Sequence, residues 1–492
     1  MHTVILGNGI VALSTAFRIV QRWTAESADS LTIVGRFSRP GSATLAAAAM
    51  FNSFAEVEAD SLNHPIDLYR FELSHLATQM WPDFERTLIH AAGDALPTAC
   101  QGCDGFNRGG CITTGTYVVN NNAADDLDDE NFDAIVKALR DFNEPHNLVA
   151  PRDIPNYAPE QRQRATRAVF IPGEGWANPR LMLDKLDAIL RRDSRVRFVD
   201  AAVERLERSA NGTQINAAVL TDSARVQGDQ YLLATGASVT DVLARSALGL
   251  PVQRIFYGVG VSLELDSPEH PHVYCIRTPN RGLACGVYTV PYYTGPCASG
   301  GPMPQPRILL GASNFTSPTP VAHGRVGSVE ALLKAGMEQI NRNFYRASLV
   351  RVNVGWRPTS QDTYPLLGRS SIPNLVIATG TKRDGFHLAP LISQYMAALL
   401  HGETVDERFA CFAPERPPLR LLTRTQAVNK AVRHQLSASY QHGFSPAKSR
   451  MPEQIVQMLR DQVERLHDEV GAVDWGIPPE MLDMYRYGHA RA

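Results

Sequence analysis

The feature that most constrains the fold is a glycine-containing turn between apolar segments at the start of the chain. Thr3–Leu6 has the pattern of a short buried strand, and Ile10–Gln21 carries its apolar residues at helical spacing. A second apolar run, Leu31–Val34, follows after a polar connection. This order of strand, turn, helix and strand predicts a βαβ unit that opens an α/β fold.

The turn itself, with the sequence GNGIVA, is typical of a dinucleotide-binding site. Gly7 permits a tight turn, Gly9 lets a pyrophosphate approach the backbone, and the small Ala12 lets helix and strand pack closely. The phosphates would lie against backbone amides at the start of the helix, where Ile10 and Val11 stand. The position of the turn inside a βαβ unit makes dinucleotide binding the favoured interpretation over a simple tight turn.

The second strand lacks the acidic residue that usually binds the ribose hydroxyls. Leu31–Val34 runs instead into Gly35 and Arg36. Either another group binds the ribose, or Arg36 lies over the adenine or contacts a phosphate. An arginine at this place is also compatible with NADP. The turn by itself therefore does not identify the cofactor.

Length, charge and cysteine content bound the class of protein. At 492 residues the chain is too long for one compact core, which predicts two packed domains plus extensions. The formal net charge of −2 gives no broad attraction to nucleic acid or to a membrane surface, so neither is expected as a partner. There is no apolar run of membrane-spanning length and no secretory signal pattern. The odd number of cysteines, seven, favours reduced thiols and a cytoplasmic protein.

The middle of the chain has a different pattern from its start. Residues 252–313 alternate apolar and polar side chains, which predicts an antiparallel sheet, with a glycine- and proline-rich loop at Gly295–Pro306. Further on we expect a helix at Val329–Tyr345 and a core strand at Leu375–Ala378. Pro390–Leu400 has proline in its first turn and a glycine just beyond its end, as helices often do.

Beyond Glu403 the pattern changes again. Glu453–Val470 places apolar residues along one helical face among polar neighbours, so residues 403–492 are expected to form a largely helical extension. This extension has three alternatives: it packs on the body, covers the active site, or forms a homo-oligomer contact.

Several separate segments resemble one known family. They are VILGNGIVALS near the start, SATLAAAAMFNSFAE (Ser42–Glu56), GEGWANPRLM (Gly173–Met182), YLLATGASV (Tyr231–Val239), GWRPTSQDTYPLLGR (Gly355–Arg369) and the stretch Asn374–Glu403. In this order they are similar to the D-amino-acid oxidase and glycine oxidase family of FAD-dependent amine oxidoreductases. The resemblance extends from Met1 to about Glu403.

The resemblance implies an α/β fold with two domains. A Rossmann-like FAD-binding domain would be discontinuous, with residues 1–60, 152–250 and 346–402. A substrate domain with an antiparallel sheet would take residues 61–151 and 251–345, and residues 403–492 would remain as the extension.

The resemblance also implies FAD, bound without a covalent link. Some relatives attach the flavin through a histidine or a cysteine, and neither residue type occurs in Ser42–Ala49 or Trp356–Thr359. The small-residue run would let backbone amides approach the cofactor, although a buried alanine-rich helix start is the alternative. The turn before the Pro390 helix would stabilise negative charge on the reduced flavin. The cofactor residues implied are Gly7, Gly9, Ile10, Val11, Ala12, Arg36, Ser42, Thr44, Ala47, Ala48, Met50, Val203, Gly236, Arg357, Gly380, Lys382, Arg383, Gly385, Phe386 and His387.

The substrate would be a small amine or amino acid. By resemblance, Arg357 binds the substrate carboxylate, a task suited to a guanidinium because of its two-pronged donor geometry. Tyr288 and Tyr292 would edge the substrate, although aromatic residues on a strand are often plain packing, and Arg383 would add a second carboxylate contact. The implied chemistry is hydride transfer from the carbon that bears nitrogen to flavin N5, giving an imine that water hydrolyses.

Three rival functions keep part of this interpretation. The same fold can act as a dehydrogenase that passes electrons to a carrier instead of O2, as an NADP-dependent reductase, or as a flavin-bearing subunit without catalysis. A metal site at Cys100, Cys103 and Cys111 is disfavoured because a fourth ligand at suitable spacing is missing.

Overall fold

The computed structural model describes residues 1–93, 111–267, 269–270, 272–284, 286–293, 306–441, 444 and 450–491. Cys100, Cys103 and nearly all of the loop predicted at Gly295–Pro306 lie outside these residues. Within the described ranges no helix is long and apolar enough to cross a membrane.

The first sheet has six strands in the order β18-β19-β11-β1-β2-β7. All pair in parallel except β18, which runs antiparallel to β19. Their bounds are β1 His2–Leu6, β2 Ser30–Val34, β7 Val196–Val199, β11 Gln230–Leu233, β18 Leu366–Arg369 and β19 Leu375–Thr379. Helix α1 (Ile10–Val20) connects β1 to β2, so the predicted βαβ unit is confirmed.

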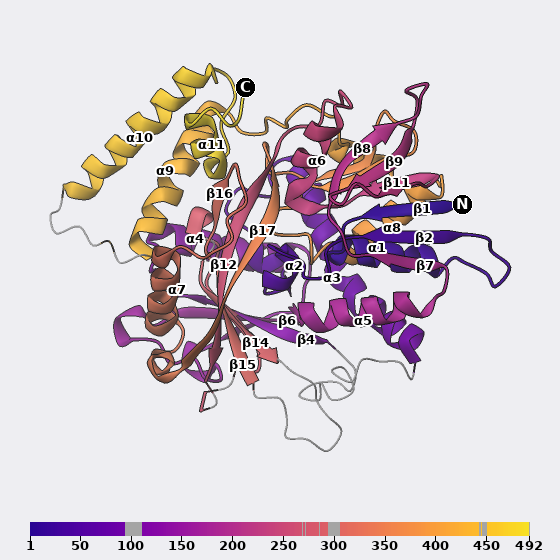
Figure 1. Cartoon of the computed structure of the whole chain (residues 1–492). Helices are drawn as coiled ribbons and strands as arrows, with labels where there is room; N and C mark the ends of the chain where they lie inside the picture. The colour runs from indigo at the N-terminus through magenta and orange to yellow at the C-terminus, as the bar shows by residue number, and fades with distance from the viewer. Residues whose placement is uncertain are drawn as a thin grey trace.

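Alternating side chains of this sheet enter two different cores. Ile5 of β1 packs on the helical side with α1, α3 (Pro65–Ala92), α5 (Pro179–Arg192) and α8 (Ala389–Leu400). Its neighbours Val4 and Leu6 pack on the other side, with a small three-stranded sheet and α6 (Val239–Ser246). That small sheet consists of β8 (Val203–Arg208), β9 (Ile215–Leu220) and β10 (Arg225–Val226). The right half of Figure 1 shows these layers.

A larger sheet of ten strands forms the rest of the body. Its longest pairing joins β12 (Ile255–Asp266) to β17 (Ser348–Ser360) in antiparallel register from Ile255–Ser360 to Asp266–Ser348. The other strands are β3 Met50–Phe51, β4 Ile112–Asn120, β5 Asn147–Val149, β6 Arg167–Ala177, β13 Cys275–Arg277, β14 Tyr288–Tyr293, β15 Pro306–Gly311 and β16 Phe315–Ser317. The predicted antiparallel pairing holds for β12, β14 and β15, whereas β13 runs parallel to β4.

Strands β6 and β17 belong to the larger sheet. The domain boundaries, with residues 152–250 and 346–402 in the FAD-binding domain, stay a prediction. One expectation differs from the structure. The helix expected at Val329–Tyr345 is α7 (Val326–Gln339) followed by a 3-10 turn at Arg342–Arg346. It stops because Asn341 is extended and its side chain accepts a hydrogen bond from the amide of Asn343 at 2.9 Å, which caps the new turn.

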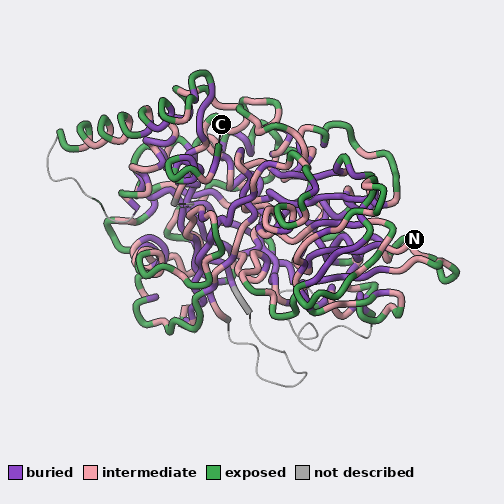
Figure 2. Tube along the Cα trace, turned by 45° about the horizontal axis from the view of Figure 1, so that its top comes forward, coloured by how far each residue is buried: buried purple, intermediate pink, exposed green. Residues whose placement is uncertain are grey.

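The extension is helical, as expected, and packs on the body. It contains α9 (Arg424–Gln441), α10 (Met451–Val470) and α11 (Leu482–Arg486). In Figure 1, α11 lies near β16, and α10 lies on the outer side of α9. Its own core includes Val463 and Leu466 and takes in Phe256 of β12, which is fully buried. Most of α10 remains exposed along the outer edge of the molecule (Figure 2). The fold class is therefore confirmed as α/β with an antiparallel second sheet and C-terminal helices.

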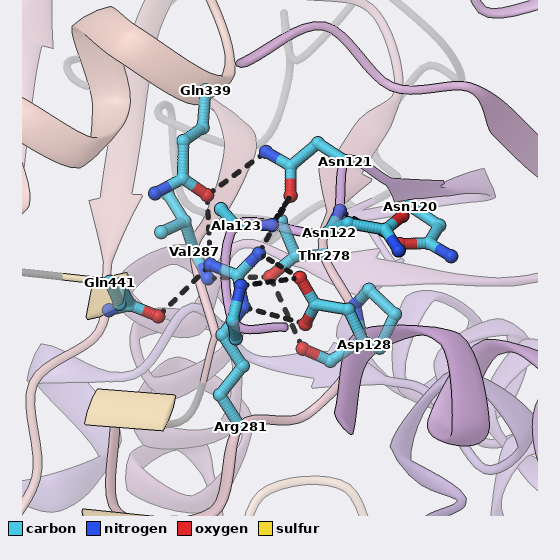
Figure 3. A network of polar contacts seen from close by, with 12 residues as sticks. Asn120, Asn121, Asn122, Ala123, Asp128, Thr278, Arg281, Val287, Gln339 and Gln441 are labelled. Atoms are coloured by element: carbon cyan, nitrogen blue, oxygen red, sulfur yellow. Dashed lines mark hydrogen bonds and ion pairs between the residues drawn. The ribbon is translucent and has the colours of Figure 1, made fainter. Parts of the chain in front are cut away.

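One fully buried arginine ties α9 to the body (Figure 3). Arg281 forms a two-pronged ion pair with Asp128 of α4 (Asp126–Asp141), at 2.8 and 2.7 Å. It also donates to Gln339 of α7 at 2.8 Å, to Asn121 at 2.8 Å and to Gln441 at the end of α9 at 3.1 Å. These bonds satisfy all five donors of the guanidinium, which is what a buried cation requires.

Candidate active site

A cavity of about 660 Å³ lies where the six-stranded sheet meets the larger sheet. Its walls come from the turn before α1, the small-residue run, the starts of β8 and α6, the middle of β12 and β17, and the turn before α8. Residues far apart in the sequence, from Gly7 to His387, therefore face one space.

The turn before α1 has the geometry of a phosphate-binding loop. Gly7 has φ +128°, and a Cβ there would lie 2.2 Å from the carbonyl oxygen of Ala234, so only glycine fits. Gly9 stands before the first helical residue, and among the described residues the nearest atom to a Cβ there would be Thr44 Oγ1, at 3.4 Å. A side chain at this position would therefore be in contact with Thr44, and glycine leaves that space free for a ligand. Thr44 accepts a hydrogen bond from the amide of Ile10 at 3.2 Å and so aligns the small-residue run with the helix start.

The absence of an acidic ribose-binding residue at the end of β2 has a steric reason. A Cβ at Gly35 would lie 2.5 Å from Cγ of Asn8. The side chain of Asn8 crosses the end of β2 and donates to the carbonyl of Arg36 at 2.9 Å. Glycine follows β2 because the asparagine of the turn occupies the space next to it. Arg36 is exposed and lines the cavity beyond this point.

The small-residue run is only briefly helical. Ser42 caps α2 (Ala43–Ala46) by accepting from the amide of Leu45 at 3.3 Å, after which the chain is extended into β3. Met50 and the alanines between α2 and β3 line the cavity. The run forms a backbone wall along the cavity rather than the start of a long alanine-rich helix.

The turn before α8 brings several charged side chains to the cavity. Lys382 has φ +49°, and its amide donates to the carbonyl of Pro358 at 2.8 Å, which holds the turn against β17. Its ammonium forms an ion pair with Glu480 of the extension at 2.5 Å, and each side chain is only 10% exposed. Burial lowers the pKa of Lys382, against the opposing effect of Glu480. Arg383 pairs with Glu56 at 3.6 Å.

His387 lies in the same turn and is buried. Its Nε2 is 2.7 Å from Thr78 Oγ1, and its carbonyl accepts from the indole of Trp81 at 2.8 Å. Burial lowers the pKa of His387 to about 4, so the imidazole is neutral at physiological pH. The turn therefore offers helix amides of α8 and no imidazolium to the cavity.

Arg357 lies on β17 with its guanidinium against the backbone of β12. A Cβ at Gly260 would lie 2.4 Å from Arg357 Nη2, so the glycine makes room for the side chain. Nη1 donates to the side chain of Asn314 at 3.0 Å and to the carbonyl of Ser313 at 3.4 Å. No carboxylate among the described residues forms an ion pair with Arg357, which is only partly buried. The guanidinium keeps donors available at the cavity wall.

Tyr288 lines the cavity and packs with the core cluster around Trp176. Tyr292 is part of β14, and its side chain lies outside the described part of the structure. Tyr257, on β12, lines the cavity and donates its hydroxyl to Asp241. Burial and the Asp241 carboxylate raise the pKa of Tyr257 to about 12.

The structure brings most residues expected from the sequence to one cavity. They are Gly7, Gly9, Ile10, Val11, Ala12, Arg36, Ser42, Thr44, Ala47, Ala48, Met50, Val203, Gly236, Tyr288, Arg357, Lys382, Arg383, Gly385, Phe386 and His387. Gly380 does not line it: this glycine, at φ +70°, forms the turn after β19 against Tyr364 and Leu366.

Sequence reasoning missed other wall residues. Thr235, Asp241 and Trp356 line the cavity. Thr235 and Trp356 lie inside segments already singled out, and Asp241 stands two residues beyond one of them. Glu480 carried no recognisable signal because its role depends on how the extension packs.

Comparison with known proteins identifies the family. The sequence model of the DAO family, described as FAD dependent oxidoreductase, matches residues 2–399. The chain belongs to this family. A solved iminodiacetate oxidase from Chelativorans sp. BNC1 superposes on this DAO-family chain with a TM-score of 0.65 at 20% identity, covering 84% of this chain and 100% of the other. A solved glycine oxidase from Geobacillus kaustophilus superposes with a TM-score of 0.64 at 18% identity, covering 84% of this chain and 98% of the other.

Two curated relatives are also similar to this DAO-family protein. A D-amino acid dehydrogenase from Methylobacterium radiotolerans is 22% identical over 444 residues, 82% of this chain and 97% of that protein. A bifunctional protein ThiO/ThiG from Nostoc sp. is 28% identical over 195 residues, which are 39% of this chain and 26% of that protein. The chain thus spans about a quarter of the length of that second relative.

The cofactor of the DAO family, FAD, fits the cavity. Beside Gly9 only Thr44 approaches the turn, and one buried polar atom of the wall, Thr235 Oγ1, lacks a hydrogen-bond partner among the described residues. Buried polar atoms in native proteins normally have a partner, so this atom marks a place where a polar ligand would bond. In the same described ranges, no cluster of three or more histidine, cysteine, aspartate or glutamate side chains is placed to hold a metal ion.

Proposed function

We propose that the protein oxidises the C–N bond of an amino acid or related amine, with FAD bound non-covalently and O2 as the electron acceptor. Bound FAD supplies a hydride acceptor at its N5 atom, and water then hydrolyses the resulting imine of the substrate. The similar proteins support this class, because they include a glycine oxidase, an iminodiacetate oxidase and a D-amino acid dehydrogenase.

The observation that carries the proposal is that the guanidinium of Arg357 has hydrogen-bond donors available at the cavity wall. Its guanidinium stands at the cavity wall with one nitrogen engaged by Asn314 and Ser313 and with no acidic partner in the described ranges. A cation held on a glycine backbone is suited to bind a carboxylate through two parallel hydrogen bonds. Arg357 would thereby orient the substrate, and Tyr288 and Tyr292 would edge it.

The remaining groups have supporting tasks. The amides at the start of α8 favour negative charge in the adjacent part of the cavity, because the N-terminus of a helix carries a partial positive charge. Arg383 already pairs with Glu56. We therefore assign Arg383 to fixing the turn before α8 against Glu56, more than to binding the substrate. Neutral His387 fixes the turn through Thr78.

One experiment on purified protein tests the proposal. Its absorbance should show oxidised flavin, and acid precipitation should release the flavin into the supernatant. Under anaerobic conditions, at least one amino acid or secondary amine from a panel containing both enantiomers should bleach the flavin. Peroxide formed under air identifies an oxidase, whereas turnover only with an artificial dye identifies a dehydrogenase. A flavin that no amine bleaches would overturn the proposal.

A further inference from the structure

A second cavity, of about 790 Å³, lies between the body and the extension. It adjoins the catalytic cavity, because Asn52, Glu56, Lys382, Arg383 and Asp384 line both. On its outer side it is bounded by the loop before α9, by α9 itself and by the segment that ends at Glu480. The extension therefore builds a space that continues from the active site.

The charged groups of this second cavity are satisfied within the protein. The Lys382–Glu480 and Glu58–Lys430 pairs join the body to the extension at 2.5 and 2.9 Å, and the Arg70–Asp384 pair, at 2.5 Å, lies within the body. A charged group on a ligand would have to displace one of these partners, which is unfavourable away from water. The cavity is thus suited to a polar ligand without charge.

Three buried atoms of the wall remain without a hydrogen-bond partner in the part of the chain that the structure describes. One is Glu480 Oε2, whose charge is balanced by the ion pair with Lys382. The two uncharged atoms are Asn52 Nδ2 and His434 Nδ1, on residues that are 3% and 6% exposed. The His434 ring lies against Gly282, where a Cβ would be 2.2 Å from both its Cγ and its Nδ1. Burial lowers the pKa of His434 to about 4, so its Nδ1 interacts as part of a neutral imidazole. Asn52 Nδ2 can donate to an amide or hydroxyl oxygen, and a neutral imidazole nitrogen can exchange one hydrogen bond with an amide or hydroxyl.

We propose that this second cavity is an outer subsite of the active site, which binds an uncharged hydrogen-bonding group at the far end of the substrate. The inference rests on the proposed function: the reacting amine lies in the first cavity and its side chain extends toward His434. The substrate class is then an amino compound with a terminal amide or hydroxyl, and residues of the extension determine this specificity.

The test measures flavin reduction in the full-length holoenzyme by alanine, norleucine and glutamine, each as both enantiomers. Norleucine has an unbranched side chain of similar length to that of glutamine but no polar end. We expect glutamine to reduce the flavin with an apparent second-order rate constant about tenfold above that of norleucine, as one or two added hydrogen bonds would give. Equal rate constants for glutamine and norleucine would overturn the subsite.

Two variants place the effect in the second cavity. Asn429→Trp fills the cavity from α9, and Thr425→Trp adds the same bulk at an exposed position of α9 outside the lining. We expect Asn429→Trp to reduce the glutamine-to-alanine ratio of rate constants at least fivefold and Thr425→Trp to leave it unchanged. His434→Phe should reduce the glutamine-to-norleucine ratio toward one.

The outcomes separate the two proposals. A ratio that Asn429→Trp does not change, in protein with normal FAD content and melting temperature, would overturn the subsite while leaving amine oxidation intact. Bound flavin that none of the amino acids or amines reduces would overturn the proposed function, and the subsite with it.

Discussion

At the scale of single residues, Arg357 depends on a glycine in the neighbouring strand. Because a Cβ at Gly260 would lie 2.4 Å from Nη2, Gly260→Ala should displace the guanidinium without removing its charge. We expect KM for a carboxylate substrate to rise about tenfold or more, with FAD still bound, as when a charge-assisted hydrogen bond worth about 1.5–3 kcal/mol is weakened.

Steady-state kinetics of Gly260→Ala beside Arg357→Ala check this expectation. Arg357→Ala should have the larger effect, and amines without a carboxylate should be equally poor substrates for both variants. Unchanged kinetics in Arg357→Ala would remove the assignment of this residue to the substrate.

A second residue-scale prediction concerns pH and stability. His272 is buried, contacts Thr289 Oγ1 at 2.9 Å, and burial lowers its pKa to about 4. Between about pH 6.5 and pH 4 the unfolded chain binds a proton here that the folded chain does not. Stability should therefore fall as the pH falls through this window, by up to about 3 kcal/mol from this group.

Thermal unfolding of the wild type and of His272→Gln between pH 7 and pH 4 measures the contribution. The variant should lose less stability across this window, while the other buried histidines act equally in both proteins. Parallel pH profiles would show that His272 contributes nothing.

Residue types in motifs were the best predicted part of the site. The glycine turn predicts from sequence alone that the backbone comes close to a ligand. The segment around Arg357 likewise predicts a cation at the site. The ribose side could not be predicted, because Asn8 occupies the space beside Gly35 only once the turn has folded.

At the scale of secondary-structure elements, the Arg281 cluster joins α4, α7 and α9. Removing the cation would leave Asp128 buried without its partner. We expect Arg281→Met to destabilise the protein by about 3–5 kcal/mol, the usual cost of breaking a buried ion pair from one side.

Urea unfolding checks this value against Arg433→Met as the matched control. Arg433 also links α9 to α4, through Glu130, but the pair is exposed, so its loss should cost less than about 1 kcal/mol. Similar losses in both variants would show that burial of the Arg281 pair has no special role.

The spacing of apolar residues predicted which segments are helices and which are strands. It did not predict to which sheet a strand belongs. Strand β6 follows the predicted boundary at 152 closely in sequence but pairs with β4, because strand pairing joins segments far apart in the chain. The helix expected to reach Tyr345 ended early at the Asn341 cap, which a pattern of apolar residues does not register.

At the scale of the whole molecule, the extension packs against the body as one folded unit with it. Phe256 of β12 is buried under the extension, and Lys382 and Lys430 are paired across the same interface. A chain shortened to residues 1–413 would expose this apolar face and leave Lys382 without its partner. We expect a lower melting temperature, aggregation and weakened FAD retention.

Differential scanning fluorimetry and the ratio of flavin to protein absorbance measure these effects on the shortened chain. A shortened protein with unchanged melting temperature and flavin content would show that the extension is an independent attachment. Sequence alone left three alternatives for this segment, because only the folded arrangement shows which face of α9 meets the body.

The position of Lys382 against Glu480 has a consequence for biosynthesis. The cavity for FAD combines Gly7 with His387, and its neighbouring wall is completed by a residue near position 480. The first strand leaves the ribosome long before these partners exist. Loading of FAD must therefore wait until the chain as far as His387 has been made, because before that point the glycine turn lacks the opposite wall of its cavity.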